Sequence, residues 1–182
     1  MKKALIHVDY THDFVAENGA LTTGQPGQAI YDDILAITQS FMNQGEYIVF
    51  AIDTHHTDDP FHPETKLFPP HNIEGSDGHQ LYAGLEDYYQ TIKDAHNVHY
   101  MPKQRYSAFA GTDLDLKLRE RGITDITIVG VCTDICVLHT AVDAYNKGYH
   151  ITIPKSCVAS FNPQGHDFAL QHFKGCLGAD II

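Results

Sequence analysis

The feature of the sequence that most constrains its fold is an alternation of short apolar runs with segments of helical period. Several of the runs are apolar at consecutive positions, which is typical of strands covered on both faces. The runs predict strands at 4–8, 47–52, 97–101, 125–131 and 150–154, with a weaker one at 178–182.

Amphipathic segments lie between these strands. Helices are expected over 28–43, from Thr112 (cap) through Glu120, over 134–147 with Thr133 as N-cap, and over 164–174. Strands and helices in alternation form right-handed βαβ units on a mostly parallel sheet. We therefore expect a single α/β domain over residues 1–182, with three layers (α/β/α) and a mostly parallel sheet of five or six strands.

Charge and composition narrow the function classes. The net charge of −11 argues against a nucleic-acid or anionic-membrane partner. No run of eighteen apolar residues occurs, and the start "MKKALIHVDY" turns polar too soon for a signal peptide. The four cysteines are expected to be free thiols, and we predict a cytoplasmic protein.

Polar or reactive residues stand at the ends of four predicted strands. Asp9, Asp53 and Lys103 follow the first three, and the segment from Cys132 to Cys136 follows the fourth. Open α/β sheets bind ligands at the carboxyl ends of their strands. The sequence therefore predicts that these residues converge at one edge of the sheet.

The long irregular stretch 54–80 is rich in His, Pro, Asp and Gly, and a loop of this length is usually functional or disordered. Asp53 and His55 are two apart on an extended segment, so their side chains project to the same side. Together with other histidines and Glu64 they suit zinc, iron or manganese. The alternative is a solvated acidic loop, and the strand-end position with four nearby prolines favours the metal site.

The segment "GVCTDICV" (130–137) holds two cysteines in a CxxxC spacing, which differs from the CxxC of thiol-disulfide enzymes. Cys136 should lie in the first helical turn, where free N–H groups and the helix dipole lower a thiol pKa. A thiolate there is nucleophilic, and backbone N–H groups can hold an oxyanion. Buried packing is the alternative, which we favour for Cys132, Cys157 and Cys176.

A nucleophile needs a base. His139 lies one turn beyond Cys136, and Asp9 is the better candidate because a buried carboxylate needs a partner that Lys103 can provide. A purely structural ion pair between Asp9 and Lys103 remains the alternative.

Four segments, in this order, resemble the isochorismatase-like cysteine hydrolases and, among them, the nicotinamidases. They are "VDYTHDF" (8–14), "DTHHTDDPFHPETKLFPPH" (53–71), "PKQRYSAFAGTDLD" (102–115) and "GVCTDICVLHTAVDAYNKGY" (130–149).

The resemblance implies a triad of Cys136 as nucleophile, Asp9 as base and then acid, and Lys103 as the cation between them. The N–H groups of Cys132 and Cys136 would hold the oxyanion, after a cis Val131–Cys132 peptide. Family members also bind one divalent ion, most often zinc, with Mn²⁺ or Fe²⁺ as alternatives. The implied ligands are Asp53, His55 and His71, with Glu64 as the fourth and His62 as its reserve.

The resemblance further implies an aromatic pocket for the ring of nicotinamide or pyrazinamide, with walls at Phe14, Phe68 and Tyr106. It implies a homo-oligomer and a role in NAD salvage. Two rivals stay open: a hydrolase of the same fold acting on a vinyl ether or a carbamoyl amide, and a zinc or thiol protein without turnover.

Overall fold

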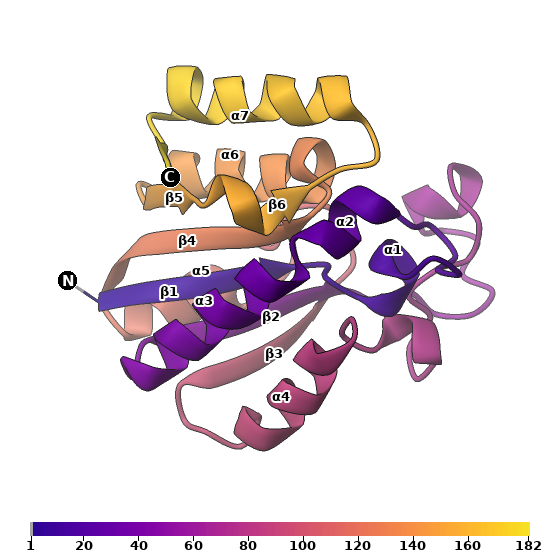
Figure 1. Ribbon diagram of the computed structural model, residues 1–182, viewed down its shortest axis with the longest axis horizontal. Helices are drawn as coiled ribbons and strands as arrows, with labels where there is room; N and C mark the ends of the chain where they lie inside the picture. Colours follow the sequence, from indigo (N-terminus) through magenta and orange to yellow (C-terminus); the bar gives the residue numbers. More distant parts are fainter. Residues whose placement is uncertain (1) are drawn as a thin grey trace.

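The computed structural model describes residues 2–182 and has a seven-stranded sheet at its centre (Figure 1). Six strands lie in the order β3-β2-β1-β4-β5-β7, β6 pairs with β4, and every pair is parallel. The strands are β1 (Lys2–Val8), β2 (Tyr47–Asp53), β3 (Val98–Lys103), β4 (Ile123–Val131), β5 (His150–Ile153), β6 (Val158–Ala159) and β7 (Asp180–Ile181).

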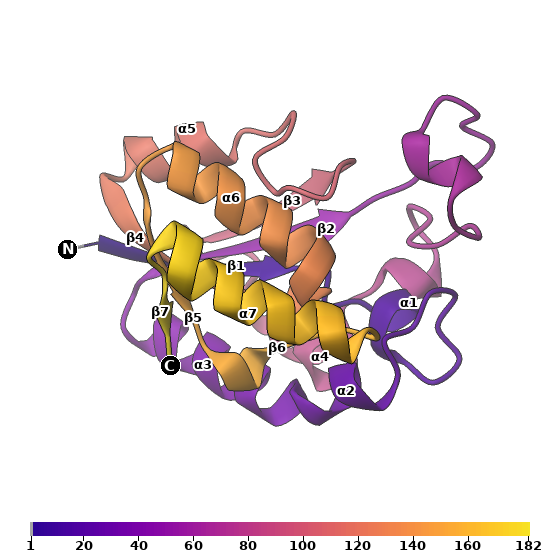
Figure 2. The same cartoon turned by 90° about the horizontal axis from the view of Figure 1, so that it is seen from above.

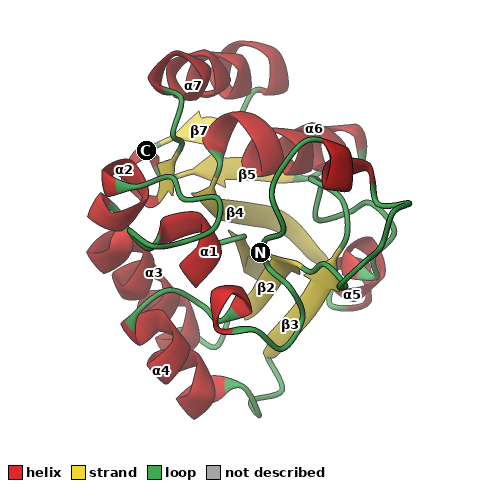
Figure 3. Ribbon diagram, turned by 90° about the vertical axis from the view of Figure 1, so that its right-hand side faces the viewer, coloured by secondary structure: helices red, strands yellow, loops and turns green. Residues whose placement is uncertain are grey.

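Helices cover both faces of the sheet (Figure 3). They are α1 (His12–Val15), α2 (Gln25–Ala29), α3 (Tyr31–Asn43), α4 (Gly84–Ile92), α5 (Leu114–Glu120), α6 (Leu138–Asn146) and α7 (Pro163–Leu177). The first four pack on one face and the last three on the other. The α/β class and its parallel sheet are therefore as expected.

Successive side chains of β1 point to opposite faces of the sheet, which explains why helices cover both faces. Ala4, Ile6 and Val8 belong to the core beneath α5, α6 and α7, whereas Leu5 belongs to the core beneath α3 and α4. All four side chains are fully buried. Each buried Leu, Ile or Val contributes about 1.5–3 kcal/mol, so a strand of this kind requires two helical layers.

The structure differs from the sequence-based expectation in its short elements. The sheet has seven strands rather than five or six. The additional strand, β6, has only two residues, too few to show a hydrophobic periodicity in the sequence. The expected helix over 28–43 is two helices that meet at Ile30, and α4 was not predicted. The N-cap of α5 is Asp113 rather than Thr112. Thr133 is no N-cap either, because it lies inside a π-helical turn, η3 (Thr133–Val137), that precedes α6.

The segment after β2 extends beyond the carboxyl end of the sheet (Figure 2). It contains two 3-10 helices, η1 (Pro63–Lys66) and η2 (Asp77–His79). All four cysteines are free thiols. Among residues 2–182, no helix combines the length and the apolar character that a membrane span requires.

Candidate active site

Asp9, Lys103 and Cys136 meet at the carboxyl edge of the sheet, as their strand-end positions predict. Lys103 Nζ lies 2.7 Å from Asp9 Oδ2, and the Cys136 thiol lies close enough to the same carboxylate for the two groups to shift each other's pKa. The backbone N–H of Asp53 donates to Asp9 Oδ1 at 2.7 Å. All three side chains are buried. A thiol, a carboxylate and an ammonium group are thereby held in contact away from solvent.

Burial dominates the protonation of this group. It raises the pKa of Asp9 to about 6, against the opposing effect of Lys103. Burial would lower the Lys103 pKa, but Asp9 and Asp53 outweigh it and keep the ammonium charged. Burial also raises the pKa of the Cys136 thiol well above its ordinary value. The expectation that the helix start lowers this thiol pKa is therefore wrong: desolvation, together with Asp9 and Asp53, outweighs the lowering effect of Lys103.

The Val131–Cys132 peptide is cis, as the resemblance implies, and Cys136 lies within η3. Long-range contacts that the sequence does not reveal fix this turn. Thr133 Oγ1 is 2.8 Å from His166 Nδ1 on α7, and the Ser160 hydroxyl donates to Asp134 at 2.6 Å. Gly130 has φ 118°, and a Cβ there would collide with the backbone of Val8 on β1. Only glycine lets β4 lie this close to β1 at the site.

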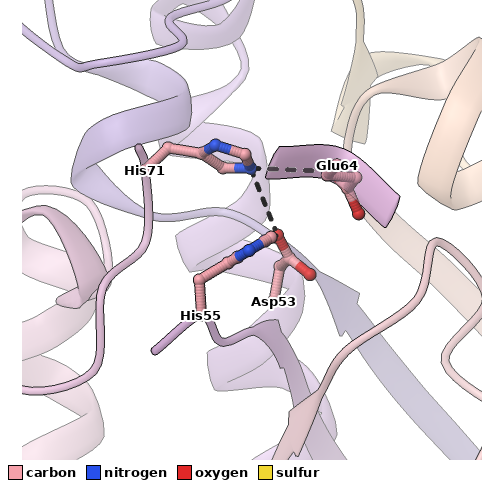
Figure 4. Close-up of side chains that lie close together, drawn as sticks. All are labelled: Asp53, His55, Glu64 and His71. Carbon is pink, nitrogen blue, oxygen red and sulfur yellow. Dashed lines mark hydrogen bonds and ion pairs between the residues drawn. The ribbon is translucent and has the colours of Figure 1, made fainter. Parts of the chain in front are cut away.

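A second buried cluster lies beside the first. The donor atoms of Asp53, His55, Glu64 and His71 all lie within 4.8 Å of one another (Figure 4). Asp53 Oδ2 is 2.6 Å from His55 Nε2 and 3.5 Å from His71 Nε2, which is 3.6 Å from Glu64 Oε2. Asp53 ends β2 and Glu64 lies in η1, so strand and loop both contribute.

The donor set fits a divalent cation. Within the described part of the chain, His71 Nε2 and Asp53 Oδ1 are buried without a hydrogen-bond partner. His71 Nδ1 donates to the Pro69 carbonyl at 2.8 Å, which leaves the Nε2 lone pair facing the cluster. Two carboxylates with two imidazoles match zinc, manganese or iron(II).

In the absence of a cation, neighbouring charges outweigh burial in setting the pKa values of this cluster. Burial by itself lowers the His71 pKa, but the adjacent Asp53 and Glu64 raise it to about 10. Burial raises the Asp53 pKa, but Lys103, His55 and His71 hold it well below its usual range.

His62, the reserve for the fourth position, has a different place. Its Nε2 donates to the Gln104 carbonyl at 2.9 Å, and its Nδ1 accepts from the Glu64 N–H at 3.3 Å. Both ring nitrogens are engaged, so Glu64 joins the cluster while His62 holds the backbone of Glu64. His56 is exposed and pairs with Glu74 instead.

An apolar pocket opens onto Cys136. Of its lining residues, sequence reasoning named Phe14, Phe68, Tyr106, Cys132, Cys136 and Glu64 and missed Leu21, Val131, Ile135 and Phe161. The Phe14 ring centroid lies 5.3 Å from that of His71, and that of Phe68 lies 6.1 Å from it. The pocket therefore adjoins both the thiol and the histidine cluster.

His139 does not pair with Cys136. It is exposed, its Nδ1 donates to the Ile135 carbonyl at 2.7 Å, and its ring packs on Tyr106. Of the two candidate bases, only Asp9 is among the groups that act on the pKa of the Cys136 thiol.

The fold agrees with the family comparison. The Isochorismatase domain model matches residues 3–182, so this chain belongs to the isochorismatase domain family. The chain is 58% identical over 181 residues to a Bacillus subtilis (strain 168) isochorismatase family protein, PncA, covering 100% of this chain and 99% of the relative.

Among the members of this family with solved structures, two that are very similar to this chain are described as nicotinamidases/pyrazinamidases. A crystal structure of Bacillus subtilis PncA, described as a nicotinamidase/pyrazinamidase, is 62% identical with a TM-score of 0.99, covering 100% of this chain and 99% of that one. The pyrazinamidase/nicotinamidase of Streptococcus mutans UA159 is 55% identical with a TM-score of 0.98, and each chain is fully covered.

Proposed function

We propose that the protein is a metal-dependent nicotinamidase, which converts nicotinamide and water to nicotinate and ammonia. The observation that carries the proposal is the contact of a Cys136–Asp9–Lys103 group with an apolar pocket that also borders a buried Asp/His/Glu/His cluster. The two highly similar nicotinamidase/pyrazinamidase structures support the same substrate class. Pyrazinamide, which presents the same ring amide, is the expected second substrate.

The first half of the reaction uses the thiol and the carboxylate. Asp9 accepts the proton of the Cys136 thiol as the sulfur attacks the amide carbonyl, so no free thiolate has to persist in the buried site. The N–H groups of Cys132 and Cys136 receive the oxyanion. Asp9 then returns the proton to the amide nitrogen, ammonia leaves, and a thioester remains on Cys136.

The second half reverses these roles. Asp9 deprotonates a water molecule that attacks the thioester carbonyl, and nicotinate leaves as the Cys136 sulfur is released and reprotonated. Lys103 remains charged throughout and stabilises the carboxylate of Asp9 at 2.7 Å. A pKa of Asp9 near 6 suits a group that accepts and donates a proton in turn.

The cluster of Asp53, His55, Glu64 and His71 would hold one divalent cation, with zinc first and Mn²⁺ or Fe²⁺ as alternatives. A cation there would act as a Lewis acid toward the pyridine nitrogen. A pyrazinamidase from Pyrococcus horikoshii has been crystallised with zinc; it is 28% identical with a TM-score of 0.86, covering 100% of this chain and 99% of that one. Phe14, Phe68 and Tyr106 would enclose the aromatic ring.

The proposal includes a cytoplasmic homo-oligomer that acts in NAD salvage. The deciding experiment measures ammonia release from nicotinamide by the wild type and by Cys136→Ala, with metal content determined on both. Activity in the wild type alone supports the mechanism. Equal rates in the two proteins would refute it.

A further inference from the structure

The carboxylate of Asp13 accepts hydrogen bonds from the turn after Phe14 and from the residue that follows His71, and the proposed mechanism does not use it. Asp13 belongs to α1, directly before Phe14. Its Oδ1 accepts the Ala20 N–H at 3.1 Å, and its Oδ2 accepts the Asn72 N–H at 2.8 Å. The side chain thus joins the turn that carries Phe14 to a residue 59 positions further along the chain.

Asn72 connects this carboxylate to both histidines of the cluster. It follows His71 in the chain, and its carbonyl accepts the His55 N–H at 3.0 Å. Asn72 is fully buried with φ 44°, a left-handed conformation that a non-glycine residue keeps only when its surroundings hold it. Asp13 supplies one such contact, and the Thr11 hydroxyl, which donates to Asn72 Oδ1 at 2.9 Å, supplies another.

Asp13 also packs on the segment that supports the other arm of the cluster. Its carboxylate lies against Gly78 of η2, where a Cβ would collide with it. The next residue, His79, has its Nε2 2.9 Å from the hydroxyl of Thr54, which stands between Asp53 and His55. One carboxylate therefore contacts the supports of both arms.

We propose that Asp13 is a positioning residue that sets the metal cluster relative to the Phe14 wall of the pocket. The inference rests on the proposed metal-dependent function. It requires that loss of the two hydrogen bonds loosen His71 and His55 while leaving the Cys136–Asp9–Lys103 group intact, because that group is held by strands β1 and β3 and by η3.

Zinc affinity, measured by competition with a chromophoric chelator, tests this without reference to turnover. Asp13→Asn keeps the volume but turns an N–H toward one of the two donors, and Asp13→Ala removes both acceptors. We expect zinc binding to weaken about 10- to 100-fold, more in Asp13→Ala than in Asp13→Asn. Asp87→Asn, which removes a charge from an exposed position on α4, is the matched control and should bind zinc as the wild type does.

Gly78→Ala provides an independent perturbation, because its methyl group displaces the same carboxylate without removing it. Its control is Gly175→Ala on α7, where the added Cβ meets nothing within 4 Å beyond its chain neighbours and the adjoining backbone of its own helix. Gly78→Ala should weaken zinc binding, and Gly175→Ala should not. At saturating zinc, Asp13→Asn should raise KM for nicotinamide more than it lowers kcat and leave the alkylation rate of Cys136 unchanged.

The outcomes separate this inference from the proposed function. Wild-type zinc affinity in Asp13→Asn, Asp13→Ala and Gly78→Ala would overturn the positioning role even if nicotinamide is hydrolysed. Weakened zinc binding in these variants would support it even if nicotinamide proves not to be the substrate.

Discussion

His7 lies on β1 and Asp9 lies just after it, two residues further along, and both are fully buried. The two side chains differ in their partners and in their charge. Asp9, at the carboxyl edge of the sheet, has a cation 2.7 Å away. His7, within the helix-covered layer, stacks on Phe50 at 4.5 Å and contacts only the hydroxyl of Thr38 with its Nε2. Burial lowers the His7 pKa to about 3, so the ring stays neutral.

The comparison separates two uses of burial. A buried ionisable group either keeps its charge beside a partner or gives the charge up. At the edge of the sheet, Asp9 and Lys103 form an ion pair at 2.7 Å, so the buried charges are retained. In the layer behind it, the same desolvation makes a titratable side chain behave as an apolar one.

The largest effect is expected for Cys136→Ala. Removal of the proposed nucleophile should lower kcat by at least about 1,000-fold, since Cys136 is the thiol that acts on the proposed base, Asp9. Cys132→Ala is the matched control: it lines the same pocket, and we assign it only a backbone role, so it should retain most of the activity. Equal losses in the two variants would show that the thiols act together, contrary to the proposed mechanism.

Lys103→Ala should destabilise the fold as well as abolish activity. It leaves the Asp9 carboxylate buried without its cation, which costs about 3–5 kcal/mol in comparable pairs. Since Lys103 lowers the Asp9 pKa, its removal raises that pKa further, and the loss of stability should shrink as the pH falls and Asp9 becomes protonated. Urea unfolding at several pH values measures this.

A double variant sharpens the same test. Asp9→Asn together with Lys103→Ala removes both charges, and it should be more stable than Lys103→Ala alone. A double variant no more stable than the single one would mean that lost packing, rather than an unpaired charge, explains the effect.

Removal of the metal should lower the stability of the protein without changing the reactivity of the Cys136 thiol. A cation present at a hundred times its Kd stabilises the native state by about 2.7 kcal/mol, and chelation or His71→Ala should remove that contribution. The rate of Cys136 alkylation should change little, because Lys103 and Asp9 act on the thiol pKa more strongly than the one ligand that also affects it, Asp53. A parallel loss of alkylation in metal-free protein would contradict this division.

The sequence predicted the residues whose position follows from the sheet itself. Asp9, Asp53 and Lys103 stand at the ends of β1, β2 and β3, and parallel register alone brings strand ends together. The sequence alone does not settle whether Glu64 or His62 is the fourth residue of the metal cluster, because that depends on how η1 orients each side chain. The His62 contact with the Gln104 carbonyl spans 42 residues and carries no local signal.

The pKa of Cys136 and the short elements escaped prediction for a related reason. A helix start suggests a lowered thiol pKa, whereas the extent of burial is a property of the whole fold. Likewise β6 is set by its pairing with β4, and the π-helical turn at Thr133 is held by His166 from a distant helix. These features depend on tertiary contacts rather than on local pattern.

The smallest predicted effect concerns the interior member of the comparison, His7. Its pKa is about 3 in the native state and 6.5 in the unfolded chain, so the unfolded state takes up the proton first as the pH falls. Between pH 7 and pH 5 this should cost the native state about 2 kcal/mol. His7→Asn should lose that part of the pH dependence of the unfolding free energy, whatever its stability at pH 7. His96→Asn, at an exposed position, is the control and should leave the pH dependence of the unfolding free energy unchanged. If His7→Asn also left it unchanged, His7 would be charged in the native state, and the interior would not neutralise it.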